Sequence, residues 1–163
     1  MKLNGLIYTL PKEWKLLIAA FSVVLSIGFY SGLTFVNKTT ENNTKGIEEN
    51  YLGNENNEEV SIMKFKKSEN EILSIIHSHI ISMSILFFLL GLLVSITALP
   101  KKIKLFLIIE PFASILLTFL GIYFLWKEII FMKYIIMFSG ILMTVIFTTS
   151  IFVILYQLIN SKK

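Results

Sequence analysis

The chain has 163 residues, of which 55% are hydrophobic and only 16% are charged. A soluble domain of this size needs a larger charged share to cover its surface, so the composition indicates a membrane protein. The chain contains no cysteine, arginine or aspartate, which excludes disulfides, thiolate metal sites and the guanidinium fork favoured in nucleic-acid recognition. We therefore attribute the net charge of +4 to membrane topology and expect no nucleic-acid partner.

Four apolar stretches approach the roughly 20 residues that a helix needs to cross a bilayer. They cover residues 16–36, 72–99, 105–126 and 129–159. The first has no small-residue cleavage site after it, so we interpret it as an uncleaved anchor. Only Lys127 and Glu128 separate the last two, which predicts a tight antiparallel hairpin. The expected fold class is all-α, a four-helix transmembrane bundle that forms a single membrane domain over residues 1–163.

The lysines predict the orientation of the bundle. The N-terminal segment, the 101–104 connection and the 161–163 tail are short and lysine-rich, whereas the longer loop 37–68 contains six glutamates. Because short basic segments stay in the cytoplasm, we expect both termini inside and the 37–68 loop outside. Residue usage rich in Ile, Phe, Asn and Lys is typical of an AT-rich genome. The predicted location is therefore the inner (plasma) membrane of a bacterium.

The outer loop contains two local signals. Residues 47–52 are expected to form one short helical turn that stops at Gly53. Ser68 and Glu71 have the spacing of a capping box, which places the start of the second membrane helix just outside the apolar core. Lys133, near the outer start of the fourth span, is expected to extend its ammonium group to water.

The second membrane helix carries His77 and His79, roughly 12 Å beyond its capped start. Ionisable residues inside a membrane are rare and usually functional. Positions i and i+2 of a helix point about 200° apart, so the two imidazoles cannot bind one ion together. We expect one to face the bundle and the other to face a neighbouring helix, lipid headgroups or a partner subunit.

Depth counting places the histidines in a layer of small residues: Gly28, Ser31, Gly32, Gly121, Ser139 and Gly140. Small residues either allow close helix crossings or leave room for a bulky ligand. For the second case we predict a b-type haem bound by His77 or His79, with Met137 as the candidate ligand on the other face. A quinone pocket with a histidine donor is also open, whereas a zinc site lacks convergent ligands.

Glu110 is the other ionisable residue within the spans. It precedes Pro111 near the cytoplasmic end of the third span, which indicates a first-turn carboxylate favoured by the helix dipole and nearby lysines. Helix geometry separates it from the histidines by roughly 20 Å or more, so we expect no shared site. A transport function is weakly supported, because Glu110 has no evident partner.

Three segments resemble a known family: Asn50-Tyr51-Leu52-Gly53, Met63-Lys64-Phe65-Lys66-Lys67-Ser68, and the run from Glu71 to Met83 that contains His77-Ser78-His79. They are similar to uncharacterised bacterial four-span inner-membrane proteins with a Tyr-x-Gly step, a Phe-Pro-Lys-Ser-like step and a Thr-His-x-His motif opening the second helix. Here Lys66 replaces the expected Pro, Ile76 the Thr, and Leu92 a further His. The resemblance implies the span pattern and no particular activity.

Two functional hypotheses remain. The leading one is an accessory or electron-transfer subunit, not an enzyme by itself, that binds b-type haem or quinone near the outer face. The alternative is a structural or assembly subunit of a membrane complex that has no cofactor. Both predict the lipid bilayer and other membrane subunits as partners.

Overall fold

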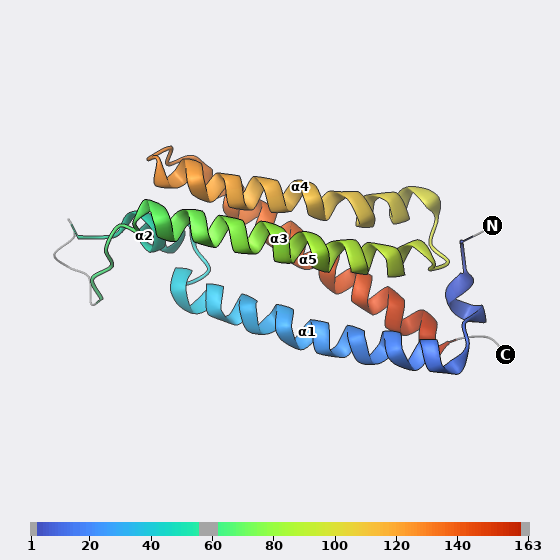
Figure 1. Cartoon of the computed structure of the whole chain (residues 1–163). Coiled ribbons are helices and arrows are strands. Elements are labelled where there is room, and N and C mark those ends of the chain that lie inside the picture. Colours follow the sequence, from blue (N-terminus) through green and yellow to red (C-terminus); the bar gives the residue numbers. More distant parts are fainter. Residues whose placement is uncertain (1–2, 56–61, 161–163) are drawn as a thin grey trace.

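The structure is a computed structural model that describes residues 3–55 and 62–160, and these ranges contain helices and no strands. A short 3-10 helix, η1 (Leu6–Thr9), precedes α1 (Lys12–Thr40), α2 (Thr44–Leu52), α3 (Glu69–Ser95), α4 (Lys101–Trp126) and α5 (Met132–Ile159). The four long helices are each long and apolar enough to cross a membrane. They run side by side, with α2 at one end of the bundle (Figure 1). The predicted all-α four-span bundle is therefore confirmed.

We call the end that carries α2 the outer end, after the predicted orientation. The lysines at 162 and 163, on which that prediction partly rests, lie outside the described residues. At this end the capping box is present, with Glu71 N–H donating to Ser68 Oγ and Ser68 N–H donating to the Glu71 carboxylate. The short outer helix is also confirmed, as α2, and its C-cap is Gly53.

The last two spans form the predicted antiparallel hairpin, but its connection is longer than the predicted two residues, because residues 127–131 separate α4 from α5. Glu128 adopts a left-handed φ of 70° and its N–H donates to Leu125 O, while Ile129 N–H donates to Phe124 O. These two hydrogen bonds are the pattern of a Schellman motif, in which the left-handed residue after the helix is usually glycine. Because Glu128 takes that place here, the sequence contained no glycine that would have indicated the end of α4 and the longer turn.

The centre of the bundle is α4, which packs along its length against α3 and α5. Small residues allow the close approach to α5: a Cβ added at Gly121 would lie 3.0 Å from Ile136 Cγ1. About one helical turn further along the same interface, the hydroxyls of Thr118 on α4 and Ser139 on α5 form a buried hydrogen bond of 2.7 Å. Close contact at small residues and interhelical hydrogen bonds are the main forces that associate helices in lipid.

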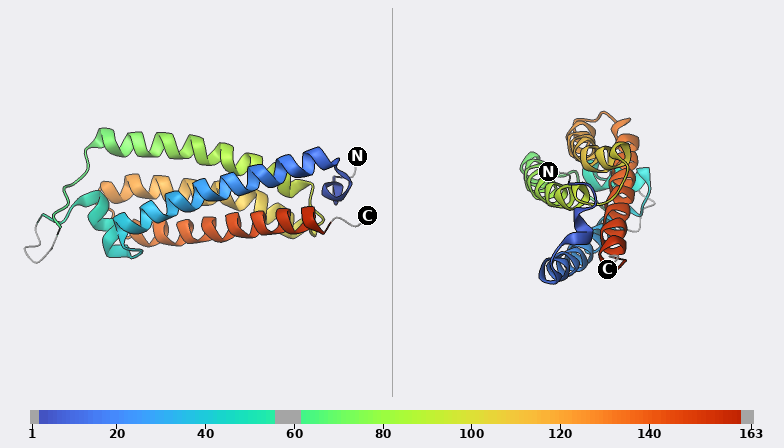
Figure 2. Two further views of the ribbon diagram at one scale, coloured as in Figure 1. Left: turned by 90° about the horizontal axis from the view of Figure 1, so that it is seen from below. Right: turned by 90° about the vertical axis from the view of Figure 1, so that its right-hand side faces the viewer.

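Helix α1 is attached to this three-helix core over a short stretch. The Phe29 ring stacks on Phe147 with a centroid distance of 3.9 Å, and the Tyr30 hydroxyl bonds to Thr148 Oγ1 at 2.8 Å. Every residue from 30 to 38 is exposed. Seen along the bundle, α1 lies at its edge, far from α4 (Figure 2). Beyond the contact of Phe29 and Tyr30 with α5, residues 31–38 of α1 therefore present an open surface.

The outer cap, residues 41–55 and 62–68, depends on two glycines. A Cβ at Gly46 would lie 1.9 Å from Thr40 O, so only glycine allows α2 to cross the end of α1 so closely. Gly53 has a φ of 82°, and a Cβ there would lie 2.7 Å from Lys66 N and 2.9 Å from Lys64 O. The returning segment therefore passes directly over Gly53, which explains the Tyr-x-Gly step in structural terms.

We predict that Gly53→Ala destabilises the protein by about 1–3 kcal/mol, because the methyl group meets backbone atoms and the left-handed φ becomes strained. The measurement is thermal unfolding in detergent, followed by tryptophan fluorescence. Gly32→Ala is the matched control, since a Cβ at Gly32 meets nothing within 4 Å. Equal melting temperatures for the two variants would contradict the prediction.

Candidate functional site

The two histidines of α3 occupy different environments, as their i, i+2 spacing predicts. His79 turns toward α4, where its ring lies 5.2 Å from the Phe119 ring, and its Nδ1 is 2.8 Å from Ile75 O. His77 is exposed, and within the described residues its imidazole has no recorded hydrogen bond or ring contact. The ring of His77 is therefore free to meet a group outside this chain.

The depth of the histidines follows from the contact with Phe119. Phe119 lies seven residues before Trp126, the last residue of α4, which corresponds to about 10 Å along the helix. Trp126 marks the outer boundary, because its indole Nε1 donates to Lys67 O in the outer cap at 2.8 Å. Tryptophan is enriched at membrane–water interfaces. The contact of His79 with Phe119 thus lies about 10 Å inside the end of the bundle that carries the outer cap.

His77 belongs to a polar, exposed face on the outer half of α3, with Ser74, Ser78 and Ser82. Ser78 Oγ donates to Ser74 O and Ser82 Oγ to His79 O, so these two hydroxyls are satisfied within the helix. His79 shows that an imidazole bonds one ring nitrogen back to its own helix, at Ile75 O, and leaves the other nitrogen for a different partner. On this face the His77 ring is the polar group with the least internal bonding among the described residues.

Met137, the third residue of the predicted haem site, lies on α5 and is partly buried against the core. Its neighbours Ile136 and Ser139 make contacts with α4. The described part of the chain contains no group of three or more His, Cys, Asp or Glu residues that could hold a metal ion. Haem ligation by Met137 and a histidine stays a prediction.

The predicted layer of small residues divides into two parts. Gly121 and Ser139 make the close crossing of α4 and α5 described above. Gly28, Ser31 and Gly32 instead lie on the exposed side of α1, and a Cβ at either glycine meets nothing within 4 Å. These small residues therefore do not surround one common cavity. Gly121 and Ser139 form the contact between α4 and α5, and Gly28, Ser31 and Gly32 form an exposed face of α1.

The placement of Glu110 corrects the first-turn interpretation. Helix α4 begins at Lys101, with Pro100 as its N-cap, so Glu110 is the tenth residue and Pro111 lies in the helix interior. Lys101 and Lys102 are more than two turns away, and Lys104 Nζ is bonded to Ser95 O and Thr97 O at the inner end. Pro100 was the available signal, because proline commonly marks the first residues of a helix. Glu110 is thus an intramembrane residue, one that the sequence interpretation had placed at the boundary.

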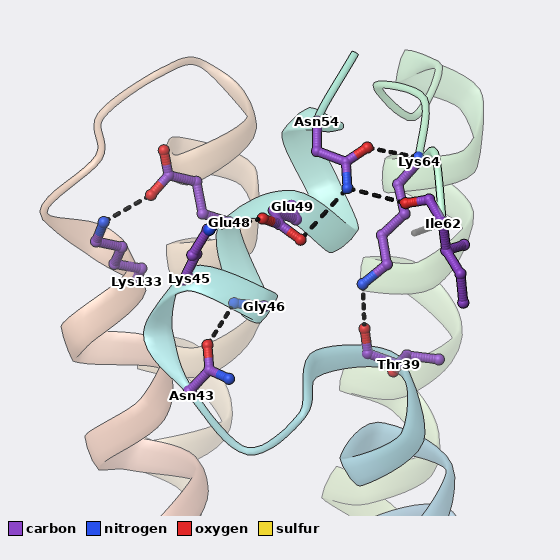
Figure 3. Close-up of polar contacts among 10 residues, drawn as sticks. All are labelled: Thr39, Asn43, Lys45, Gly46, Glu48, Glu49, Asn54, Ile62, Lys64 and Lys133. Carbon is purple, nitrogen blue, oxygen red and sulfur yellow. Dashed lines mark hydrogen bonds and ion pairs between the residues drawn. The ribbon is translucent and has the colours of Figure 1, made fainter. Parts of the chain in front are cut away.

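Ion pairs hold the outer cap on the bundle, and these were not predicted from the sequence. Lys133 Nζ lies 2.6 Å from Glu48 Oε2 of α2, instead of extending freely to water (Figure 3). Lys66 pairs with Glu128 at 2.6 Å, and this hydrogen-bonded ammonium lowers the pKa of Glu128. Lys133 therefore extends toward the outer end as predicted, but its ammonium group meets Glu48 instead of bulk water, because α2 folds back over the start of α5.

Further contacts close the loop itself. Asn54 accepts from Lys64 N–H at 2.7 Å and donates to Ile62 O at 3.1 Å (Figure 3). Lys64 Nζ donates to Thr39 O, one of the carbonyls left open at the end of α1. The first two segments of the family resemblance also meet in the outer cap, where Lys67 N–H donates to Tyr51 O at 3.2 Å, whereas the third segment lies in α3.

A family model that describes a transmembrane helical domain, Aq_1264_TM, matches residues 41–163. The chain belongs to this family. No curated protein and no solved structure matches the chain. The matched region begins directly after α1 ends at Thr40, so the Aq_1264_TM domain comprises the outer cap and the three-helix core. The boundary of the family coincides with the change from the closely packed helices to the loosely attached one.

Tyr51 of the Aq_1264_TM domain provides a test of the outer cap. Burial raises its pKa to about 12, whereas a free tyrosine titrates at about 10. Because the folded pKa is the higher one, its contribution to stability is complete below about pH 10 and is lost as the pH rises through about 12. We predict that Tyr51→Phe removes this alkaline loss.

The measurement is the unfolding midpoint in detergent between about pH 9 and pH 12, with phenolate absorbance recorded in parallel. The exposed Tyr134 supplies the matched control, since Tyr134→Phe should leave the alkaline loss in place. A wild-type midpoint that is independent of pH in this range would show that Tyr51 is not buried by the cap.

Proposed function

We propose that the protein is a non-enzymatic membrane subunit that binds another membrane helix bundle through the exposed faces of α1 and α3. The observation that carries the proposal is the open Gly28–Gly32 face of α1, where neither glycine meets another part of the chain. In α4 a small residue serves a close helix crossing, as Gly121 does against Ile136. Small residues four apart on a membrane helix favour the same close approach by a partner helix.

The outer face of α3 supports the same proposal. His77 points out of the bundle within the outer leaflet, where lipid chains provide no hydrogen-bond partner. A partner helix with a hydroxyl, amide or carbonyl at this depth would satisfy the imidazole. Each interhelical hydrogen bond of this kind contributes about 0.6–2 kcal/mol in a membrane, enough to orient a complex that close contacts hold together.

The loose attachment of α1 is the third argument. Over its apolar window only 11% of residues are buried, against 44% for α4. A helix gains stability in lipid by van der Waals contact with other helices, and α1 obtains little of it from its own chain. A second bundle against the outer half of α1 would supply that contact.

Position-specific photo-crosslinking in native membranes tests the proposal. Benzoylphenylalanine at Ile27, which is 67% exposed, should give a discrete adduct with one membrane protein. The matched control is Phe138 on α5, which is 66% exposed but lies on a face without small residues or histidine. The same adduct pattern at both positions would contradict the proposed interface.

Substitution of the glycine face provides a second test. Gly28→Leu combined with Gly32→Leu should abolish the adduct at Ile27 and leave the melting temperature of the isolated protein within a few degrees of wild type, since both positions are open. Gly121→Leu should instead lower the melting temperature, because the new side chain meets Ile136. Persistence of the adduct in the double variant would exclude close approach at this face.

A second candidate function concerns the free imidazole of His77. We propose that a b-type haem or a quinone, if this subunit takes part in electron transfer, is bound at the outer face of α3 between the protein and its partner. The support is the exposed, unpaired ring of His77, in contrast to His79, whose Nδ1 is already beside Ile75 O. The second haem ligand would come from the partner or from Met137, which is partly buried on α5.

For this candidate we predict a Soret band in the reduced-minus-oxidised spectrum of the native complex, purified from cells that have haem available. His77→Ala should abolish the band, and His79→Phe should retain it. If the complex shows no Soret band, quinone is extracted from the same preparation and measured. Quinone without a Soret band would identify the cofactor as a quinone. Absence of both would leave the structural role alone.

A further inference from the structure

Glu110 lies deep in the membrane. It is nine residues beyond Lys101 and sixteen before Trp126, which places it about 14 Å and about 24 Å from the two ends of α4. A bilayer core is about 30 Å thick, so both distances put the carboxyl within hydrocarbon depth. The carboxyl therefore lies well inside both interfaces, away from the interfacial water that surrounds most surface glutamates.

The carboxyl group of Glu110 is only half satisfied. Ser114 Oγ, one turn further along α4, donates a hydrogen bond to Oε1. Oε2 is enclosed by protein and has no hydrogen-bond partner among the described residues. Pro111 follows directly, is buried, and has no N–H to offer to Leu107 O one turn earlier. The surroundings of Glu110 thus supply one neutral donor and no positive charge.

The titratable groups on the neighbouring helices are placed elsewhere. Lys104 Nζ is at the inner end, bonded to Ser95 O and Thr97 O, and Lys133 is at the outer end, paired with Glu48. The Tyr30 hydroxyl bonds to Thr148, and the histidines lie in the outer half of α3. The remaining lysines and glutamates of the long helices lie near helix ends: Lys12, Glu13, Lys15, Lys38, Glu69, Glu71, Lys101 and Lys102. In the described structure no ion pair involves Glu110.

We propose that Glu110 is an intramembrane proton-binding site, in which the neutral carboxylic acid is the resident form and one proton is exchanged with the aqueous phase. A negative charge in hydrocarbon has to be compensated: an ionised carboxylate there needs a cation or several hydrogen-bond donors. Among the described residues Glu110 has one neutral donor and no cation, so a bound proton is what neutralises its carboxyl group. This site is independent of the proposed subunit interface, which lies on α1 and α3.

An apolar carbodiimide tests the proposal on the full-length protein in phospholipid vesicles. Dicyclohexylcarbodiimide reacts with a protonated carboxyl: the O–H adds across one C=N bond, and the O-acylisourea rearranges to a stable N-acylurea. The whole reagent is retained and nothing leaves, so peptide mass spectrometry locates the adduct directly. We expect the adduct on Glu110 and its loss in Glu110→Gln, which preserves the shape of the side chain and an acceptor for Ser114.

The matched controls are Glu13 and Glu128, two exposed carboxylates that should remain unmodified in the same sample. A proton site is supported if the labelling rate of Glu110 declines as the pH is raised and does not depend on the sodium concentration. Protection by sodium ions at constant pH overturns it in favour of a metal cation at the same carboxylate. Labelling of Glu13 or Glu128 without Glu110 overturns it altogether.

Discussion

Lipid chains offer no hydrogen bonds, so each polar group inside the bilayer needs a partner within protein. Most hydroxyls of this bundle bond to a carbonyl three or four residues earlier, as Thr144 does to Gly140 O, and Thr118 pairs across helices with Ser139. A few buried hydroxyls have no such bond, yet rotation about one torsion brings a serine within reach of its own helix. An imidazole or a carboxyl has two polar atoms, and one contact on its own helix leaves the other atom open, as at Glu110. The cofactor candidate rests on His77 and the proton site on Glu110, whereas the proposed subunit interface rests first on the open Gly28–Gly32 face.

The same constraint separates the chain into two parts. The core of α3, α4 and α5 matches small residues to close crossings, and the outer cap closes it through Gly46, Gly53 and lysine–glutamate pairs. Helix α1 precedes the matched family region and carries its own small residues on an exposed face. A closed core with an appended, open helix is an arrangement suited to attachment. This is why we favour a subunit role over a cofactor site within one chain.

Part of the candidate site followed directly from local rules. The capping box at Ser68 was predicted from its spacing, and the i, i+2 spacing predicted that His77 and His79 face different ways. In the structure the His79 ring contacts Phe119 of α4. Other details required backbone choices that the residue types do not reveal. Glu128 adopts the left-handed position where glycine is usual, so the longer turn after α4 was missed. Glu110 was assigned to the first turn because the start of the span was taken from the first apolar residues, at 105, whereas the helix begins directly after Pro100.

The sequence by itself determined the number of spans, their approximate ends and the short helix of the outer cap, because hydrophobic length and capping residues act locally. Only the tertiary structure decided which face of each helix is exposed. A soluble helix shows its buried side as an apolar stripe, but a membrane helix is apolar on all sides. The rotation of α1 that exposes Gly28 and Gly32, and of α3 that exposes His77, therefore depends on the neighbouring helices, and no periodicity in the sequence records it.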